Sequence, residues 1–289
     1  MLNLSQHKAQ QGFLTFALNT ADVDYLRLAY LQALNIKATQ TNAQVAVVVD
    51  SQTRELLNDS HHSVFDYIID LARDDSSMAS SWRLDNEWQA FWLTPFKETI
   101  KVESDLLFTR SIDHWWNTFR LRDIVLSHGC RDYQQNISTS KKYRQVFINN
   151  QLPDVYNGLM YFRFTKTARD FFTYARQIYE NWDTVKNTIK NCRDDQATTD
   201  VVFALAAQLV GPELCTIPSA DFVNFTHMKP AHNNFDEDLT FQQTFVSEFD
   251  SGMIRVNGIN QLHPFHYHDK TFASDDMIEY YESRILKST

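Results

Sequence analysis

The sequence predicts an α/β protein in which helices flank a central, mostly parallel sheet, with a hairpin and a helix at the C-terminal end. The sheet is predicted by an apolar run at 12–18, helical spacing at 26–34 and a second apolar run at 44–49. Strand, helix and strand in this order form a βαβ unit, which has parallel strands and a right-handed crossover. The hairpin is predicted by Asn257-Gly258, the strongest short turn signal in the chain.

The other elements follow from the same periodicities. We expect Asp22 to cap the first helix, and Asp275 and Asp276 to lie in the favourable first turn of the last one. Further helices are expected at 64–72, 167–181, 199–209 and 274–286, and further strands at 98–102, 155–164, 221–226, 254–256 and 259–268.

The composition restricts the class of protein. A chain of 289 residues with 43% hydrophobic residues can bury a large core, here predicted as a core region at 1–210 and a completing C-terminal part at 211–289. No run approaches the roughly 20 apolar residues of a membrane helix, and no leader pattern opens the chain, so we expect a cytoplasmic protein. The net charge of −9 disfavours sequence-independent binding of nucleic acid as the main purpose.

Acidic residues follow two of the predicted strands. Asp50 follows 44–49, and Glu103 and Asp105 follow 98–102. Open parallel sheets bind ligands beyond the carboxyl ends of their strands. Carboxylates at i and i+2 suit Mn²⁺ or Mg²⁺ bound to a diphosphate, although the same pattern also occurs where acids cap the next segment.

The segment TPFKETIKVESDLLF (94–108) resembles the Asp-x-Asp region of GT-A glycosyltransferases, particularly glycosyltransferase family 8 and its relatives. Pro95-Phe96, an apolar strand, the acidic pair and a second apolar run follow one another in the same order. One position departs from the family pattern. Glu103 replaces the first Asp, which leaves Asp105 as the safer metal ligand.

Three further segments resemble the same family in the same order. FLTFALNTADVDY (13–25) is similar to the strand and loop that clasp the nucleotide, and YNGLMYF (156–162) to the strand under the donor sugar. Residues 194–196 resemble an Asp-Gln pair that opens a helix near the sugar hydroxyls, with Asp200 as an equally placed rival. The resemblance therefore implies four candidates near the reacting sugar: Asp194, Asp195, Gln196 and Asp200.

Family 8 also brings a late His to the metal and a Lys to the diphosphate. Two segments are candidates, FTHMKP (225–230) and HYHDK (266–270), and the sequence leaves the choice open. The implied metal ligands are Glu103, Asp105, His227, His266 and His268. The implied nucleotide-sugar ligands are Ala17, Asn19, Tyr25, Asp50, Ser104, Asn157, Gly158, Lys229 and Lys270.

The resemblance implies metal-dependent transfer of a sugar to a hydroxyl from a nucleoside diphosphate sugar, with UDP as the expected carrier and retention at the anomeric carbon. The acceptor stays open among a glycan, a protein and a hydroxymethylated base of viral DNA, and a basic stretch at 120–144 bears on the last. Two alternatives are a sugar-1-phosphate nucleotidyltransferase and a non-catalytic carbohydrate-binding protein. The first would need a Gly-rich, basic loop, which residues 18–25 lack. The sugar and the oligomeric state also stay open.

Overall fold

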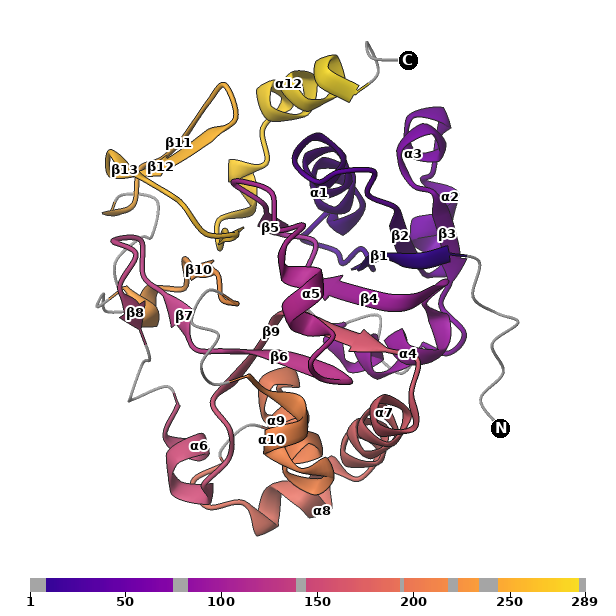
Figure 1. The fold of residues 1–289 in the computed structure, drawn as a ribbon, viewed down its shortest axis with the longest axis vertical. Coiled ribbons are helices and arrows are strands. Elements are labelled where there is room, and N and C mark those ends of the chain that lie inside the picture. Colours follow the sequence, from indigo (N-terminus) through magenta and orange to yellow (C-terminus); the bar gives the residue numbers. More distant parts are fainter. Residues whose placement is uncertain are drawn as a thin grey trace.

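The computed structural model describes residues 9–74, 83–138, 144–192, 195–217, 223–233 and 244–285. Its centre is a six-stranded sheet with the strand order β3-β2-β1-β4-β9-β6 (Figure 1). β1, β2, β3 and β4 pair in parallel, and β9 runs antiparallel to both β4 and β6. The predicted mostly parallel sheet is therefore confirmed. Its strands are β1 (Ala9–Ala17), β2 (Val45–Val49), β3 (Tyr67–Asp70), β4 (Phe96–Val102), β6 (Ile124–His128) and β9 (Val155–Arg163).

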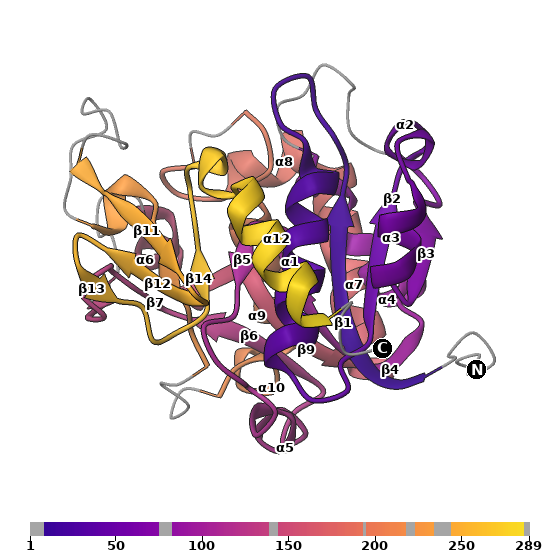
Figure 2. The same cartoon turned by 90° about the horizontal axis from the view of Figure 1, so that it is seen from above.

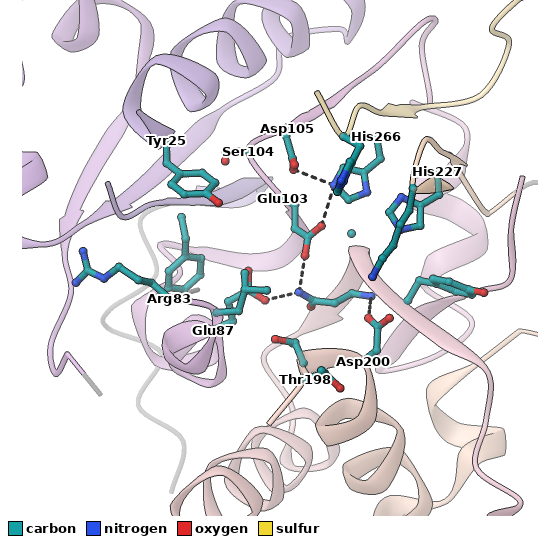
Figure 3. A pocket seen from close by; sticks show the side chains of 18 of the residues that line it. Tyr25, Arg83, Glu87, Glu103, Ser104, Asp105, Thr198, Asp200, His227 and His266 are labelled. Atoms are coloured by element: carbon teal, nitrogen blue, oxygen red, sulfur yellow. Dashed lines mark hydrogen bonds and ion pairs between the residues drawn. The ribbon is translucent and has the colours of Figure 1, made fainter. Parts of the chain in front are cut away.

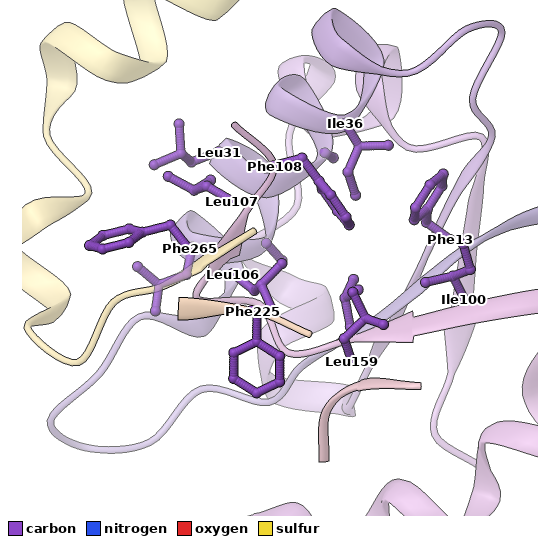
Figure 4. Close-up of a cluster of buried hydrophobic side chains, with 14 of the residues drawn as sticks. Phe13, Leu31, Ile36, Ile100, Leu106, Leu107, Phe108, Leu159, Phe225 and Phe265 are labelled. Atoms are coloured by element: carbon purple, nitrogen blue, oxygen red, sulfur yellow. The ribbon is translucent and has the colours of Figure 1, made fainter. Parts of the chain in front are cut away.

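Helices cover both faces of this sheet, which is why its central strands are apolar on both sides. Alternate residues of β1 enter two different cores: Phe13 packs with residues of α1 (Figure 4) and α12, and Leu14 packs with residues of α7 and α9. These two pairs of helices lie on opposite faces of the sheet (Figure 2). The four helices are α1 (Tyr25–Thr39), α12 (Asp275–Ile285), α7 (Lys166–Glu180) and α9 (Thr199–Val210). None of the helices in the described ranges is long and apolar enough to cross a membrane.

Short elements connect these layers. The helical ones are α2 (Ser51–Glu55), α3 (Asp59–Val64), η2 (Leu84–Gln89), α4 (Ala90–Leu93), α5 (Trp115–Phe119), α6 (Gln145–Asn150), α8 (Trp182–Val185), η3 (Lys186–Thr188), α10 (Pro212–Cys215), η4 (Pro230–His232) and η5 (Lys270–Phe272). The short strands are β5 (Leu106–Leu107), β7 (Cys130–Arg131), β8 (Ile137–Ser138), β10 (Thr226–His227), β11 (Ser247–Asp250), β12 (Met253–Val256), β13 (Ile259–Asn260) and β14 (Phe265–His266).

A second sheet joins distant parts of the sequence, in the order β5-β14-β10-β7-β8. β10 pairs in parallel with β14 and with β7, and β14 pairs antiparallel with β5. The strands thus come from residues 106–138 and from residues 226–266. This sheet brings the late segments beside the acidic residues that follow β4. The boundary near residue 210 stays a prediction.

The hairpin at Asn257-Gly258 is confirmed, because β12 and β13 pair antiparallel on either side of it. Asn257 and Gly258 have φ values of 49° and 78°, the left-handed backbone that a two-residue hairpin turn requires. The strand expected at 259–268 is shorter, since it divides into β13 and β14.

Two local predictions were wrong. The segment 64–72 is not a helix, because Val64 ends α3 and Tyr67–Asp70 forms the edge strand β3. There the β-branched Ile68 and Ile69 pair with β2, so tertiary pairing overrides the helical spacing. The cap of α1 is Asp24 rather than Asp22, since the Asp24 side chain accepts a hydrogen bond from the Arg27 backbone N–H. Of the strand expected at 221–226, residues 221 and 222 lie outside the described ranges, and β10 begins at Thr226.

Candidate functional site

A cavity with a volume of ≈ 240 Å³ lies at the carboxyl ends of β1 and β4. β9 begins at the same edge because it runs antiparallel to β4, and the Glu103 N–H donates to the Gly158 carbonyl at 3.0 Å. The first turn of α9 also reaches this edge. The lining of this cavity includes twelve of the site residues expected from the sequence: Tyr25, Glu103, Ser104, Asp105, Asn157, Gly158, Asp200, His227, Lys229, His266, His268 and Lys270.

Three side chains converge in the cavity in a geometry that could hold a metal ion. His266 Nε2 lies 3.1 Å from Glu103 Oε2 and 3.0 Å from Asp105 Oδ1 (Figure 3). One potential ligand atom from each residue lies within 4.8 Å of the others. Two carboxylates suit Mg²⁺ or Mn²⁺, and an imidazole nitrogen adds affinity for transition metals. The donor set therefore fits a divalent cation.

Sheet pairing explains how His266 reaches the acidic pair. In the pairing of β14 with β5, His266 lies opposite Leu106, and the next residue, Tyr267, donates its N–H to the Asp105 carbonyl at 3.1 Å. β10 places His227 on the other side of His266, where the two rings stack with centroids 4.7 Å apart. Of the three histidines that the sequence left open, His266 is the one beside both carboxylates. His227 and His268 line the cavity outside this group.

Opposite charges control the ionisation of this group. Burial alone would raise the pKa of Asp105, but His266 and Lys270 outweigh it and hold that pKa well below its usual range. Burial would lower the pKa values of His266 and Lys270, and the Asp105 carboxylate raises both instead. Lys270 Nζ donates directly to Asp105 Oδ2. His266 and Lys270 thus neutralise the Asp105 carboxylate at a point where a bound cation could neutralise it instead.

A buried ion pair lies beside this group and was not predicted. Lys101 Nζ contacts Glu87 Oε2 at 2.5 Å and donates to Asn157 Oδ1 at 2.9 Å. Asn157 Nδ2 donates to Glu87 and, at 3.0 Å, to Glu103 Oε1. Burial raises the pKa of Glu87 to about 7 against the attraction of Lys101. The available signal was a lysine within the apolar strand TIKV, because a buried lysine needs a partner.

Four residues were expected near the reacting sugar. Among those that the structure describes, Asp200 alone lines the cavity. Its Oδ2 pairs with Arg144 Nη1 at 2.7 Å, and its Oδ1 accepts the Asn157 backbone N–H at 2.8 Å. Asp195 and Gln196 are exposed away from the cavity, and Asp195 pairs with Lys186. Asp194 lies outside the described residues.

Arg144, the partner of Asp200, was not predicted as part of the site. Its guanidinium lies between the rings of Phe147 and Tyr156, at 3.7 and 3.9 Å from their centroids. It also pairs with Asp154. The side chain is 2% exposed, so this arginine holds Asp200 from inside the protein.

Phe16, Leu18 and Leu84 form an apolar part of the cavity lining, and Tyr25 also lines the cavity. Three of the expected nucleotide-sugar ligands do not line the cavity. The first is Ala17, whose side chain is buried with Phe13 in the core on the face of the sheet opposite to Phe16.

Asn19 and Asp50 are the other two, and they lie in the segments that follow β1 and β2. Asn19 Oδ1 accepts the Leu26 N–H at 2.9 Å. Asp50 accepts the Thr53 N–H at 2.7 Å and pairs with Arg83, which does line the cavity. Their contacts are therefore internal to the protein.

Comparison with known proteins found similarities among solved structures. No family model matches the sequence, and no curated protein matches it. The chain is similar to glycosyltransferases of known structure. The galactosyltransferase LgtC, in complex with donor and acceptor sugar analogs, is 12% identical over 94% of this chain and 95% of its own, with a TM-score of 0.49.

Two further structures show a comparable similarity. Mouse xyloside xylosyltransferase 1 is 12% identical over 72% of this chain and 84% of its own, with a TM-score of 0.46. The glycosyltransferase GlyE of Streptococcus pneumoniae TIGR4 is 8% identical over 72% of this chain and 46% of its own, with a TM-score of 0.41. At these identities and scores, none of the similarities assigns a role to a residue here.

Proposed function

We propose that this chain is a metal-dependent glycosyltransferase that moves a sugar from a nucleoside diphosphate sugar to a hydroxyl. The supporting observation is the convergence of Glu103, Asp105 and His266 in a cavity at the carboxyl end of β4, with their donor atoms within 4.8 Å of one another. The resemblance of residues 94–108 to an Asp-x-Asp region points to the same chemistry. UDP is the carrier that this resemblance implies.

Glu103, Asp105 and His266 would hold Mn²⁺ or Mg²⁺. When bound, such an ion supplies Lewis-acid stabilisation of the charge that develops on a departing diphosphate. Lys270, now paired with Asp105, would contact the diphosphate, and Lys229 lines the same cavity. Positive groups fixed before the reaction stabilise developing charge without reorganisation. Tyr25 and the apolar walls formed by Phe16 and Leu18 would accept the nucleoside.

Asp200 would lie near the transferred sugar. Each of its oxygens already accepts one hydrogen bond, so its position is set before a ligand enters. Groups that are oriented in advance in this way position substrates with little loss of conformational entropy. The resemblance implies that the sugar is transferred with retention at the anomeric carbon.

The described part of the basic stretch does not favour a DNA acceptor over a glycan or a protein. Arg120 pairs with Glu98, Arg122 donates to the Glu213 carbonyl, and Arg131 donates to Asn224. None of the three lines the cavity. Lys141 and Lys142 lie outside the described residues. We therefore propose only that the acceptor carries a hydroxyl.

Isothermal titration of UDP with and without Mn²⁺ tests the proposal. A transferase of this type binds UDP much more tightly when the ion is present, because the diphosphate completes its coordination. Hydrolysis of UDP-sugars without acceptor gives a second readout. Metal-independent sugar binding without UDP binding would identify a carbohydrate-binding protein, and formation of a nucleotide-sugar from a nucleoside triphosphate and a sugar-1-phosphate would identify a nucleotidyltransferase.

A further inference from the structure

Glu87 places a further carboxylate in the cavity, close to the Glu103 and Asp105 carboxylates that are proposed to hold the metal. Its side chain is 3% exposed and lines the cavity. Its Oε2 accepts from Lys101 Nζ at 2.5 Å and also from Asn157 Nδ2. The same Asn157 nitrogen donates to Glu103 Oε1 at 3.0 Å, so one amide nitrogen separates the two carboxylates (Figure 3).

Stability alone gives no account of this arrangement. Replacing a buried ion pair by apolar residues of similar volume is often neutral or stabilising, because the pair must first be desolvated. Lys101 also donates to Asn157 Oδ1 at 2.9 Å, which turns the amide so that Nδ2 faces both carboxylates. Lys101 and Asn157 together fix the Glu87 carboxylate by Oε2. Among the residues that the structure describes, we find no hydrogen bond to the other oxygen, Oε1.

A sugar attached to a diphosphate at the Glu103, Asp105 and His266 group would lie next to Glu87. We propose that Glu87 determines which donor sugar is accepted, through a hydrogen bond from a sugar hydroxyl to Oε1. This role rests on the proposed function. A site that holds a buried acceptor for a hydroxyl discriminates strongly against a sugar that lacks it, because the acceptor is then left unpaired.

Glu87→Gln gives a sharp test, because Lys101 and Asn157 both donate to this side chain. The glutamine carbonyl must face these donors, so its NH₂ replaces the acceptor that would face the sugar. The measurement is the dissociation constant, with Mn²⁺, of UDP and of UDP-glucose, UDP-galactose, UDP-N-acetylglucosamine and UDP-xylose. We expect the donor that the wild type binds best to bind at least about tenfold more weakly to the variant, while UDP changes less than about threefold.

Asp85→Asn is the matched control, since Asp85 is also in η2 but does not line the cavity. This variant should change none of the five dissociation constants. Thermal unfolding shows whether Glu87→Gln folds. If it does not, Glu87→Asp is used instead, because its shorter side chain moves the carboxylate away from the sugar.

Two outcomes overturn the role of Glu87. One is equal weakening of UDP and UDP-sugar, and the other is unchanged binding of all four donors. A wild type that binds no UDP with Mn²⁺ overturns the proposed function itself, and this role with it. Binding of UDP by the wild type with Mn²⁺ therefore distinguishes a failure of the role of Glu87 from a failure of the proposed function.

Discussion

Asp105 and His266 are 161 positions apart in the sequence, and their side chains lie 3.0 Å apart from Oδ1 to Nε2. The contact depends on the pairing of β14 with β5, which also joins the Tyr267 N–H to the Asp105 carbonyl. Two neighbouring backbone segments thus carry the two side chains at a fixed separation.

Asp105→Asn should weaken Mn²⁺-dependent binding of UDP at least about tenfold, because an amide is a much poorer ligand for a divalent cation than a carboxylate. Isothermal titration with and without Mn²⁺ measures the effect. Asp195→Asn is the control, since the Asp195 side chain is 99% exposed and outside the cavity. Metal-dependent binding that is equal in both variants would show that Asp105 holds no ion.

The histidines can be ranked by the same measurement. His266→Gln should lose most of the Mn²⁺ dependence, because Nε2 is the nitrogen beside both carboxylates. His227→Gln should keep the Mn²⁺ affinity within about threefold, since His227 is separated from the carboxylates by the His266 ring. The reverse order would move the ion to the side of His227.

Arg144→Met should lower the free energy of unfolding by about 3–5 kcal/mol, because it leaves the Asp154 and Asp200 carboxylates without their buried partner. Urea denaturation measures this loss. Arg163→Met is the matched control, since its pair with Asp123 is partly exposed and should be worth less than about 1 kcal/mol. Similar small losses in both variants would contradict the buried role of Arg144.

Asp50 should make stability depend on pH in the acid range. Burial raises the pKa of Asp50, but the hydrogen bonds from Thr53 and the pairing with Arg83 outweigh it and leave the pKa below the ordinary 3.8. A carboxyl whose folded pKa is depressed contributes stability that is present above its unfolded pKa and lost as the pH falls through the folded one.

The free energy of unfolding of the wild type should therefore fall more steeply than that of Asp50→Asn from about pH 5 to about pH 2. Urea denaturation at several pH values in this interval tests it. At neutral pH the variant should be the less stable protein, since it removes the carboxylate that pairs with the buried Arg83 guanidinium, whereas asparagine still caps the helix. Parallel pH profiles would show that Asp50 has an ordinary pKa in the folded state.

Local features of the chain were enough to predict much of the sheet. The apolar runs of β1 and β2 and the helical spacing of α1 each lie within one short segment, and their periodicity reports burial directly. The edge strand β3 was mistaken for a helix, because its half-buried residues show no clear alternation and its pairing with β2 is not visible locally. Asn157 was predicted as a ligand of the nucleotide-sugar from a resemblance, whereas its hydrogen bond to Glu103 depends on the pairing of β9 with β4.

The sequence by itself determined the parallel sheet and the acidic pair at the end of β4, because buried strands and the residues that follow them are readable over a few positions. Only the tertiary structure decided that His266 rather than His227 meets that pair, that Asp200 rather than Asp195 faces the cavity, and that Lys101 binds Glu87. These choices depend on which strands pair and in what register. Such pairing reflects the energy of the whole packed chain rather than of any one segment.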